Sequence, residues 1–84
     1  MDEMAVGLVT HYFPHVRAAA VSLPQPLRIG DRIHVVGRTT DVVMTVDRLQ
    51  VEHADVQEAR AGDDVAVHVA ERVREHDEVR KVEG

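Results

Sequence analysis

The 84-residue sequence has no cysteine and almost no aromatic side chains, and each absence excludes a class of protein. Without cysteine there is neither a disulfide framework nor a thiolate zinc site. Tyr12 and Phe13 are the only aromatic residues, which leaves a thin stacking platform for single-stranded nucleic acid. No apolar run approaches the roughly 18 residues of a membrane span, and the acidic residues near the start are unlike a basic signal peptide. We therefore expect a cytoplasmic protein with no membrane segment.

The composition is that of a small folded domain. Hydrophobic residues make up 44% and charged residues 30%, with a formal net charge of −5. This balance favours a globular chain over a disordered one. The length fits a single domain over residues 1–84 with a core of about 5–82, and its small size is compatible with a homodimer. Valine is frequent, which favours strands over helices.

Alternating apolar residues separated by turn signals predict an all-β protein with six short strands. In the first strand the alternation places Val6 and Leu8 on the same face. Such short, regularly spaced strands are typical of a small barrel or sandwich. The predicted strands are 5–10, 16–23, 32–36, 42–52, 65–69 and 78–82.

Two Gly-Asp pairs and one change of apolar parity mark the turns. Gly30 and Gly62 supply a positive φ, and the aspartate after each can close the turn through its side chain. Segment 58–61 leaves one helical turn open as an alternative. Within 42–52 the apolar residues change parity, which predicts a β-bulge or sharp bend at 47–48 that returns both halves to the core.

Two segments resemble the second domain, a β-barrel, of the translation GTPases. They are Leu-Arg-Ile-Gly-Asp-Arg-Ile-His-Val-Val-Gly at 27–37 and Glu-Ala-Arg-Ala-Gly-Asp-Asp-Val-Ala-Val at 58–67. Residues 77–82 resemble its closing strand more loosely, and the order of the pieces covers about 5–82. The layout also resembles stand-alone elongation factor-like small proteins. Through Gly-Leu-Val at 7–9 and Tyr12 it is similar to the C-terminal barrel of collagenase-like peptidases.

The resemblance implies a six-stranded, closed, Greek-key β-barrel similar to domain 2 of translation factors. It implies a non-enzymatic binding module for protein biosynthesis, contacting a ribosome-, tRNA- or translation-factor-related partner. The sequence has no phosphate loop, so it carries no GTPase domain. Residues 1–4 are too short for the strand that helps to form the aminoacyl pocket, so no tRNA-contacting residue is assigned. The alternative is an accessory barrel subunit of a separate enzyme, such as a collagenase-like peptidase.

A metal-binding protein built on the six histidines is a further alternative. His11 and His15 have a ligand spacing that suits a helix, but Pro14 and the strand pattern argue against a helix there. His34 and His68 alternate with buried positions and are expected to point to solvent. The sequence therefore assigns no metal ligand and no cofactor.

No catalytic arrangement is visible, and we expect a protein that is not an enzyme. Asp63 and Asp64 are adjacent and would point to opposite faces of a strand. The only serine, Ser22, lies in a predicted strand without a nucleophile-elbow context. A threonine nucleophile in the 37–41 loop would need a positioned base, and none can be named.

The binding residues are expected in loops carried by the rigid strands. The 37–41 loop and the aromatic pair provide one part, and basic residues near 72–81, interleaved with acidic ones, provide another. The partner is expected to be macromolecular, with RNA disfavoured by the negative charge. An exposed apolar patch would favour a protein partner over RNA. The predicted binding residues are Tyr12, Phe13, Arg17, Arg38, Thr39, Thr40, Arg72 and Arg74.

Overall fold

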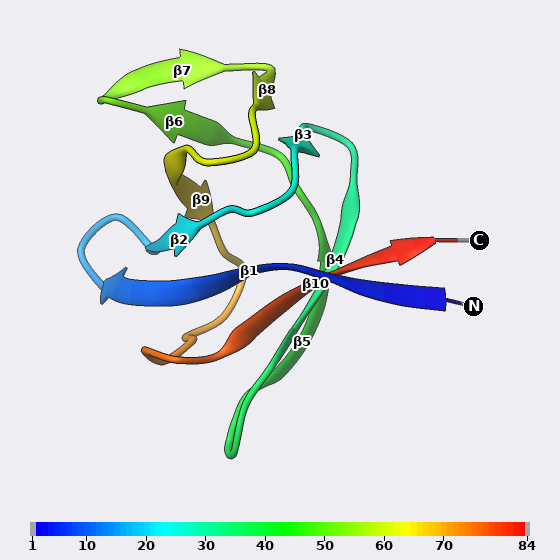
Figure 1. Cartoon of the computed structure of the whole chain (residues 1–84). Coiled ribbons are helices and arrows are strands. Elements are labelled where there is room, and N and C mark those ends of the chain that lie inside the picture. The colour runs from blue at the N-terminus through cyan, green and yellow to red at the C-terminus, as the bar shows by residue number, and fades with distance from the viewer. Residues whose placement is uncertain (1, 84) are drawn as a thin grey trace.

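The computed structural model describes residues 2–83, which form ten strands and no helix (Figure 1). No membrane-spanning helix therefore occurs among these residues. The strands are β1 (Asp2–Phe13), β2 (Ala18–Ser22), β3 (Leu27–Arg28), β4 (Arg32–Val36), β5 (Asp41–Thr45), β6 (Leu49–Val51), β7 (Ala54–Val56), β8 (Glu58–Ala59), β9 (Asp64–His68) and β10 (Glu78–Glu83).

Eight strands form one curved antiparallel sheet in the order β5-β4-β10-β1-β2-β9-β6-β7, and β3 pairs with β8 in a separate small sheet. The predicted all-β class is confirmed. The predicted closed barrel of six strands is wrong, because β5 and β7 remain edges that do not pair with each other. Closure depends on pairing between distant strands, and the alternation of apolar residues within a strand does not report that pairing.

Strand β1 organises the sheet because it pairs with β10 along one half and with β2 along the other. It continues to Phe13, beyond the predicted end of the strand. An irregularity between Ala5 and Gly7 shifts the register. As a result Val6 is fully buried whereas Leu8 is 51% exposed, so the prediction that they share a face is wrong. A Cβ on Gly7 would lie 2.6 Å from the carbonyl oxygen of Ser22, which explains the glycine.

The predicted fourth strand is two strands separated by residues 46–48. β5 pairs with β4 at one edge, whereas β6 pairs with β9 and β7 on the other side of the sheet. Val46 and Leu49, of opposite parity, are both buried, at 1% and 0% exposed. The predicted bend and the return of both halves to the core are confirmed. The chain achieves them by leaving the strand altogether, not by a bulge within one strand.

The core consists mainly of small aliphatic side chains. Leu27 and Ala59, paired across the small β3–β8 sheet, have no exposed surface, so this sheet covers the core. Segment 58–61, in which one helical turn was left open, contains strand β8 instead. The buried apolar residues are Val6, Val9, Ala19, Val21, Leu23, Leu27, Ile33, Val35, Val42, Val46, Leu49, Ala59, Val65, Val67, Val69, Val73 and Val79.

Candidate binding surface

Three turns of the same construction each lead into a strand. In each, an aspartate carboxylate accepts a hydrogen bond from the backbone N–H of the arginine three residues earlier. The aspartate N–H in turn donates to that arginine's carbonyl oxygen. The predicted turn closure by the first two aspartates is confirmed, and the third turn is one that the sequence pattern did not indicate. The N–H to carboxylate distances are 2.9 Å for Arg28–Asp31, 2.9 Å for Arg60–Asp63 and 2.7 Å for Arg74–Asp77.

The third turn differs from the other two at the residue that precedes the aspartate. Gly30 and Gly62 occupy this position with φ values of 96° and 92°, whereas the third turn has His76 at 74°. An L-residue with a side chain pays a steric cost in this left-handed region, of roughly 1–2 kcal/mol. The third turn is therefore held in a conformation that its own sequence disfavours.

Packing around Asp77 holds the third turn in place. Asp77 is only 4% exposed. A Cβ on Gly37, in the turn between β4 and β5, would overlap the Asp77 carboxylate. The two turns therefore approach each other closely only because Gly37 has no side chain. This contact fixes the 72–77 loop against the β4–β5 turn.

Residues of this loop line two adjacent hollows. The first, of about 660 Å³, is lined by His11, Tyr12, Pro14 and Arg72–Glu75. The second, of about 350 Å³, is lined by Gly37–Thr39 and Arg74–Asp77. Both include Arg74 and Glu75, so they form one continuous surface. We call it the Arg74 surface and define it by His11, Tyr12, Arg38, Thr39, Arg72, Arg74, Glu75 and His76.

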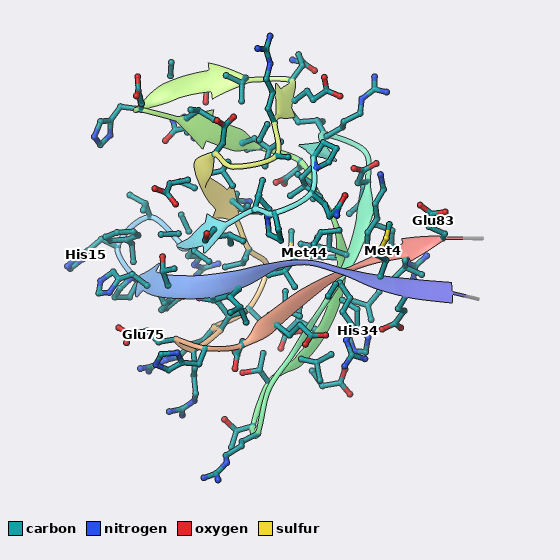
Figure 2. All side chains as sticks on the ribbon, viewed as in Figure 1. Met4, His15, His34, Met44, Glu75 and Glu83 are labelled. Carbon is teal, nitrogen blue, oxygen red and sulfur yellow. The ribbon has the colours of Figure 1, made fainter. Side chains whose placement is uncertain are left out.

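The side chains of the Arg74 surface are partly ordered by contacts with one another. The Arg72 guanidinium carbon lies 6.0 Å above the centre of the Tyr12 ring. The Nδ1 atom of His11 lies 3.3 Å from Oε1 of Glu75. His15 and Glu75 lie at the same end of the molecule, away from Glu83 and Met4 (Figure 2). Glu75 of this surface therefore lies at the end of the molecule opposite to Met4 and Glu83.

Five of the predicted binding residues meet on the Arg74 surface: Tyr12, Arg72 and Arg74 in the first hollow, and Arg38 and Thr39 in the second. Their binding role stays a prediction. The surface also includes three residues that the sequence reasoning did not select, namely His11, Glu75 and His76. The spacing Arg-x-x-Asp at 74–77, which repeats that at 28–31 and 60–63, is the signal that could have found the last of them.

The other three predicted binding residues lie apart from the two hollows. Phe13 is 42% exposed and packs edge-on against His11, with ring centres 4.5 Å apart. Arg17 stands in the β1–β2 turn with a φ of 51°. Thr40 is 5% exposed, and its carbonyl oxygen accepts the Gly37 N–H at 2.9 Å. Thr40 is therefore placed to close the turn.

A third hollow, of about 510 Å³, is lined mainly by apolar groups and lies near the register shift in β1. Leu8, half exposed, forms part of its wall. We call it the Leu8 groove. This is an exposed apolar patch of the kind that favours a protein partner over phosphate contacts. Its lining residues are Ala5, Gly7, Leu8, Ser22, Leu23, Pro24, Gly62 and Glu78.

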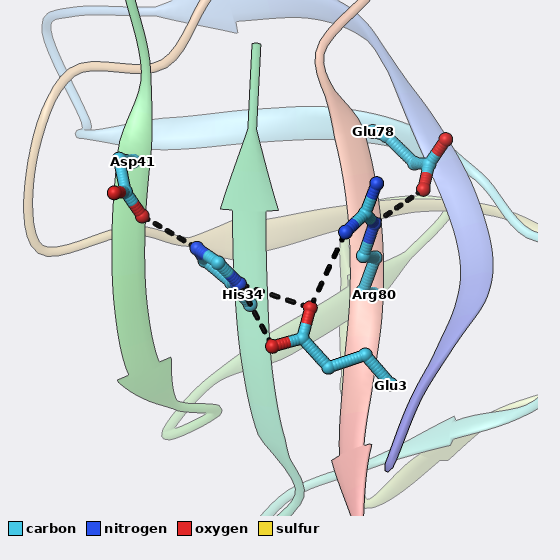
Figure 3. A network of polar contacts seen from close by, with 5 residues as sticks. All are labelled: Glu3, His34, Asp41, Glu78 and Arg80. Carbon is cyan, nitrogen blue, oxygen red and sulfur yellow. Dashed lines mark hydrogen bonds and ion pairs between the residues drawn. The ribbon is translucent and has the colours of Figure 1, made fainter. Parts of the chain in front are cut away.

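The outer face of the sheet carries a network of charged side chains, the His34 network, that spans β1, β10, β4 and β5 (Figure 3). The two nitrogens of His34 lie 3.0 Å from Oε1 of Glu3 and 2.5 Å from Oδ1 of Asp41. Arg80 lies 3.5 Å from Glu3 and 2.5 Å from Glu78. His34 lies on the outer face, as its alternation with buried positions predicted, but its contacts with Glu3 and Asp41 leave its side chain only 19% exposed.

Hydrogen bonds within this network shift the pKa values of three groups, one of which is Arg80, whose pKa is raised by its bond to Glu78. The bond to Asp41, followed by the bond to Glu3, raises the pKa of His34 above 6.5, and burial opposes this only in part. The bond to His34 lowers the pKa of Glu3 below 4.5. Both shifts favour the charged pair. Because both ring nitrogens face carboxylates, neither is open to a metal ion.

Two other histidines also contact carboxylates. His68 Nδ1 lies 3.0 Å from Asp47, in addition to the pairing of His11 with Glu75. Across the residues that the structure describes, no three His, Asp or Glu side chains converge as metal ligands. Of the six histidines, His34 therefore contacts two carboxylates, and His11 and His68 contact one each.

Comparisons with known proteins show which folds and sequences the chain is similar to. No family model matches the sequence. The chain is 36% identical over 78 residues to an uncharacterized protease of Methanocaldococcus jannaschii. The match covers 92% of this chain, which spans 19% of that relative's length.

Two crystal structures of the C-terminal domain of a Geobacillus thermoleovorans protein assigned to the U32 peptidases are similar to the chain, each with a TM-score of 0.86. One, a selenomethionine variant, is 22% identical and the match covers 92% of this chain and 98% of that domain. The other is 24% identical, with 96% and 93% covered. The fold is therefore that of this C-terminal domain.

These findings separate the two resemblances that the sequence suggested. They agree with the similarity to the C-terminal barrel of collagenase-like peptidases and give no support to the translation-factor interpretation. The Gly-Asp segments that suggested translation factors are turns that lead into strands β4 and β9. Such a turn is a local device, which explains why two of them did not identify the family.

Proposed function

We propose that this chain is a non-catalytic binding module that associates with a peptidase-like catalytic chain. The similarity to a whole C-terminal domain, together with the 19% share of the archaeal protease, carries the proposal. A module of this kind would place or hold a partner, while another part of the assembly performs the chemistry. Its role would be that of an accessory unit with no activity of its own.

The Leu8 groove is the surface that suits this association. Protein interfaces have an apolar centre from which charged groups are depleted. In the groove wall the carboxylate of Glu78 is engaged by Arg80 at 2.5 Å, so it does not oppose an apolar partner. The relative consists mostly of chain beyond the aligned part, and we infer that a peptidase-like catalytic chain of that kind is the occupant.

Affinity capture from the native lysate, read by mass spectrometry, tests the proposal. A tagged protein should retain a stoichiometric peptidase-like chain after nuclease treatment. Leu8→Glu should abolish that capture because it introduces a charge into an apolar contact. Val43→Glu, at a 49% exposed site on strand β5, is the matched control and should capture normally.

Two results would contradict the proposal. One is recovery of ribosomal proteins that disappear on nuclease treatment, which would restore the translation interpretation. The other is capture of no peptidase-like chain by a protein whose circular dichroism and melting temperature show that it is folded. If capture is equal for both variants, the association stands but the Leu8 groove is not its site.

A further inference from the structure

We propose that the Arg74 surface binds an acidic polypeptide segment. This inference goes beyond the proposed function because it concerns a different face of the molecule and a different partner chemistry. It begins with the guanidinium groups. Among the residues that the structure describes, Arg38, Arg72 and Arg74 make no ion pair.

Of the seven basic residues elsewhere, four contact acids, one of them Arg80, whereas Arg17, Arg32 and Arg60 make no ion pair with residues 2–83. Arg28 contacts Glu58 at 3.6 Å, and Arg48 contacts Asp55 at 3.1 Å. Lys81 contacts Asp31 at 3.3 Å. Three guanidiniums without such a partner therefore lie together on one continuous surface, in a chain with a net charge of −5.

The two acids on the Arg74 surface form no ion pair with these three guanidiniums. Glu75 is engaged by His11 at 3.3 Å. The Asp77 carboxylate is buried and accepts the backbone N–H of Arg74 at 2.7 Å. The surface thus keeps a local excess of positive charge, and a partner with carboxylates would complement it.

Backbone strain at the same place is a second, independent observation. Of the three aspartate-closed turns, only the one that borders both hollows has a residue with a side chain, His76, in the left-handed region. Strain of this kind persists where the surrounding structure enforces it, and it gathers at ligand-binding sites. Here the contact between Gly37 and Asp77 enforces it and leaves the exposed imidazole at the edge of the second hollow.

The shape and chemistry favour a polypeptide over a nucleic acid. Arginine pairs with carboxylates through two parallel hydrogen bonds, so separate guanidiniums suit separate carboxylates. The first hollow also offers apolar contact through Pro14 and the Tyr12 ring, which suits a side chain. A stacked base would compete with Arg72, which already lies over that ring, and the charge of −5 opposes a run of phosphates.

Fluorescence anisotropy with a labelled, glutamate-rich peptide containing one phenylalanine tests this inference. The purified protein should bind this peptide and should bind the same peptide with Gln in place of Glu much more weakly. The double variant Arg72→Ala/Arg74→Ala should weaken binding at least about tenfold, because two charge-assisted contacts are lost. The double variant Arg28→Ala/Arg48→Ala removes the same formal charge elsewhere and should change affinity less than about twofold.

Three results would overturn the inference: equal affinity for the Glu and Gln peptides, equal losses in the two double variants, or tighter binding of a labelled oligouridylate than of the acidic peptide. Melting temperatures within a few degrees of the parent protein show that each variant is folded. Because Leu8 is unchanged in these variants, failure here leaves capture of the catalytic chain to be judged separately.

Discussion

On the outer face of β1, β10, β4 and β5, the charged side chains of the His34 network contact one another (Figure 3). On the Arg74 surface, three guanidiniums have no acidic partner among residues 2–83, and one turn is held in a disfavoured conformation. The first arrangement satisfies its charges internally and supports the pairing of four strands. The second leaves guanidinium charges without an acidic partner within residues 2–83 and a turn in a disfavoured conformation. This difference is what we expect if one face serves the fold and the other is the proposed binding surface.

The contact between Gly37 and Asp77 should give the largest effect on this comparison. Gly37→Ala places a methyl group where the Asp77 carboxylate lies, so either the β4–β5 turn or the 72–77 loop must move. We expect the free energy of unfolding to fall by about 3 kcal/mol, from overpacking and loss of the Arg74 N–H bond. Urea denaturation measures it.

A double-mutant cycle shows whether this contact is the cause. In an Asp77→Ala background the clash is absent, so Gly37→Ala should then cost much less than in the parent protein. If Gly37→Ala lowers the free energy of unfolding equally in both backgrounds, Gly37 is required for another reason. The contact with Asp77 would then no longer explain the strain in the third turn.

The three aspartate-closed turns predict opposite effects for two substitutions at the same turn position. Gly62→Ala should destabilise by about 1 kcal/mol, because its φ of 92° is unfavourable although no atom would clash with the new Cβ. His76→Gly should instead stabilise by about 0.5 kcal/mol, since relief of strain outweighs the added flexibility of the unfolded chain. Thermal unfolding of the two variants measures both. If His76→Gly also destabilises the protein, the imidazole contributes to the stability of the fold. His76 could then no longer be counted as strain that distinguishes the Arg74 surface from the His34 network.

The His34 network should give the smallest effect, visible as a pH dependence. The folded-state pKa of His34 is raised above 6.5. The contribution of His34 to stability is therefore fully present below that value and is lost as the pH rises through the folded pKa. For Glu3 the pKa is lowered below 4.5, so its contribution is present above that value and is lost as the pH falls through the folded pKa.

The network therefore stabilises most between the two ordinary values, 4.5 and 6.5. Raising the pH from about 6 to about 9 should lower the urea midpoint of the parent protein more than that of His34→Gln. If the urea midpoints of the two proteins change equally with pH, the network contributes nothing to stability. The contrast with the Arg74 surface would then disappear. His68→Gln, which removes a more exposed histidine pair, is the control and should leave the dependence nearly unchanged.

Strands with clear alternation could be predicted closely from the sequence. The prediction of 32–36 coincides with β4, and that of 65–69 is shifted by one residue from β9. The hairpin of β6 and β7 was missed for a physical reason. Its two central residues, Glu52 and His53, have φ values of 51° and 65°, a conformation usually signalled by Asn-Gly. Tertiary pairing selects this turn, and the local sequence gives no sign of it.

The candidate site could be predicted in part. Tyr12, Arg72 and Arg74 were selected as aromatic and basic residues, and they do share one hollow. His76 was missed because a glycine was taken as the mark of a turn, and here the fold imposes the glycine conformation on a histidine. The contact between the 72–77 loop and Gly37 joins segments far apart in the sequence, which no local pattern reports.

The pairing of Asp2 with Glu83 has a mechanical consequence. β1 and β10 are antiparallel neighbours whose outer ends lie side by side (Figure 1). A force that pulls these two ends apart acts across the strand pair, as on a zipper, and loads one pair of residues at a time. The pairs from Asp2/Glu83 to Leu8/Glu78 would therefore open in order at low force. A pull between the β1 start and the β1–β2 turn would act along the strand and strain many bonds together.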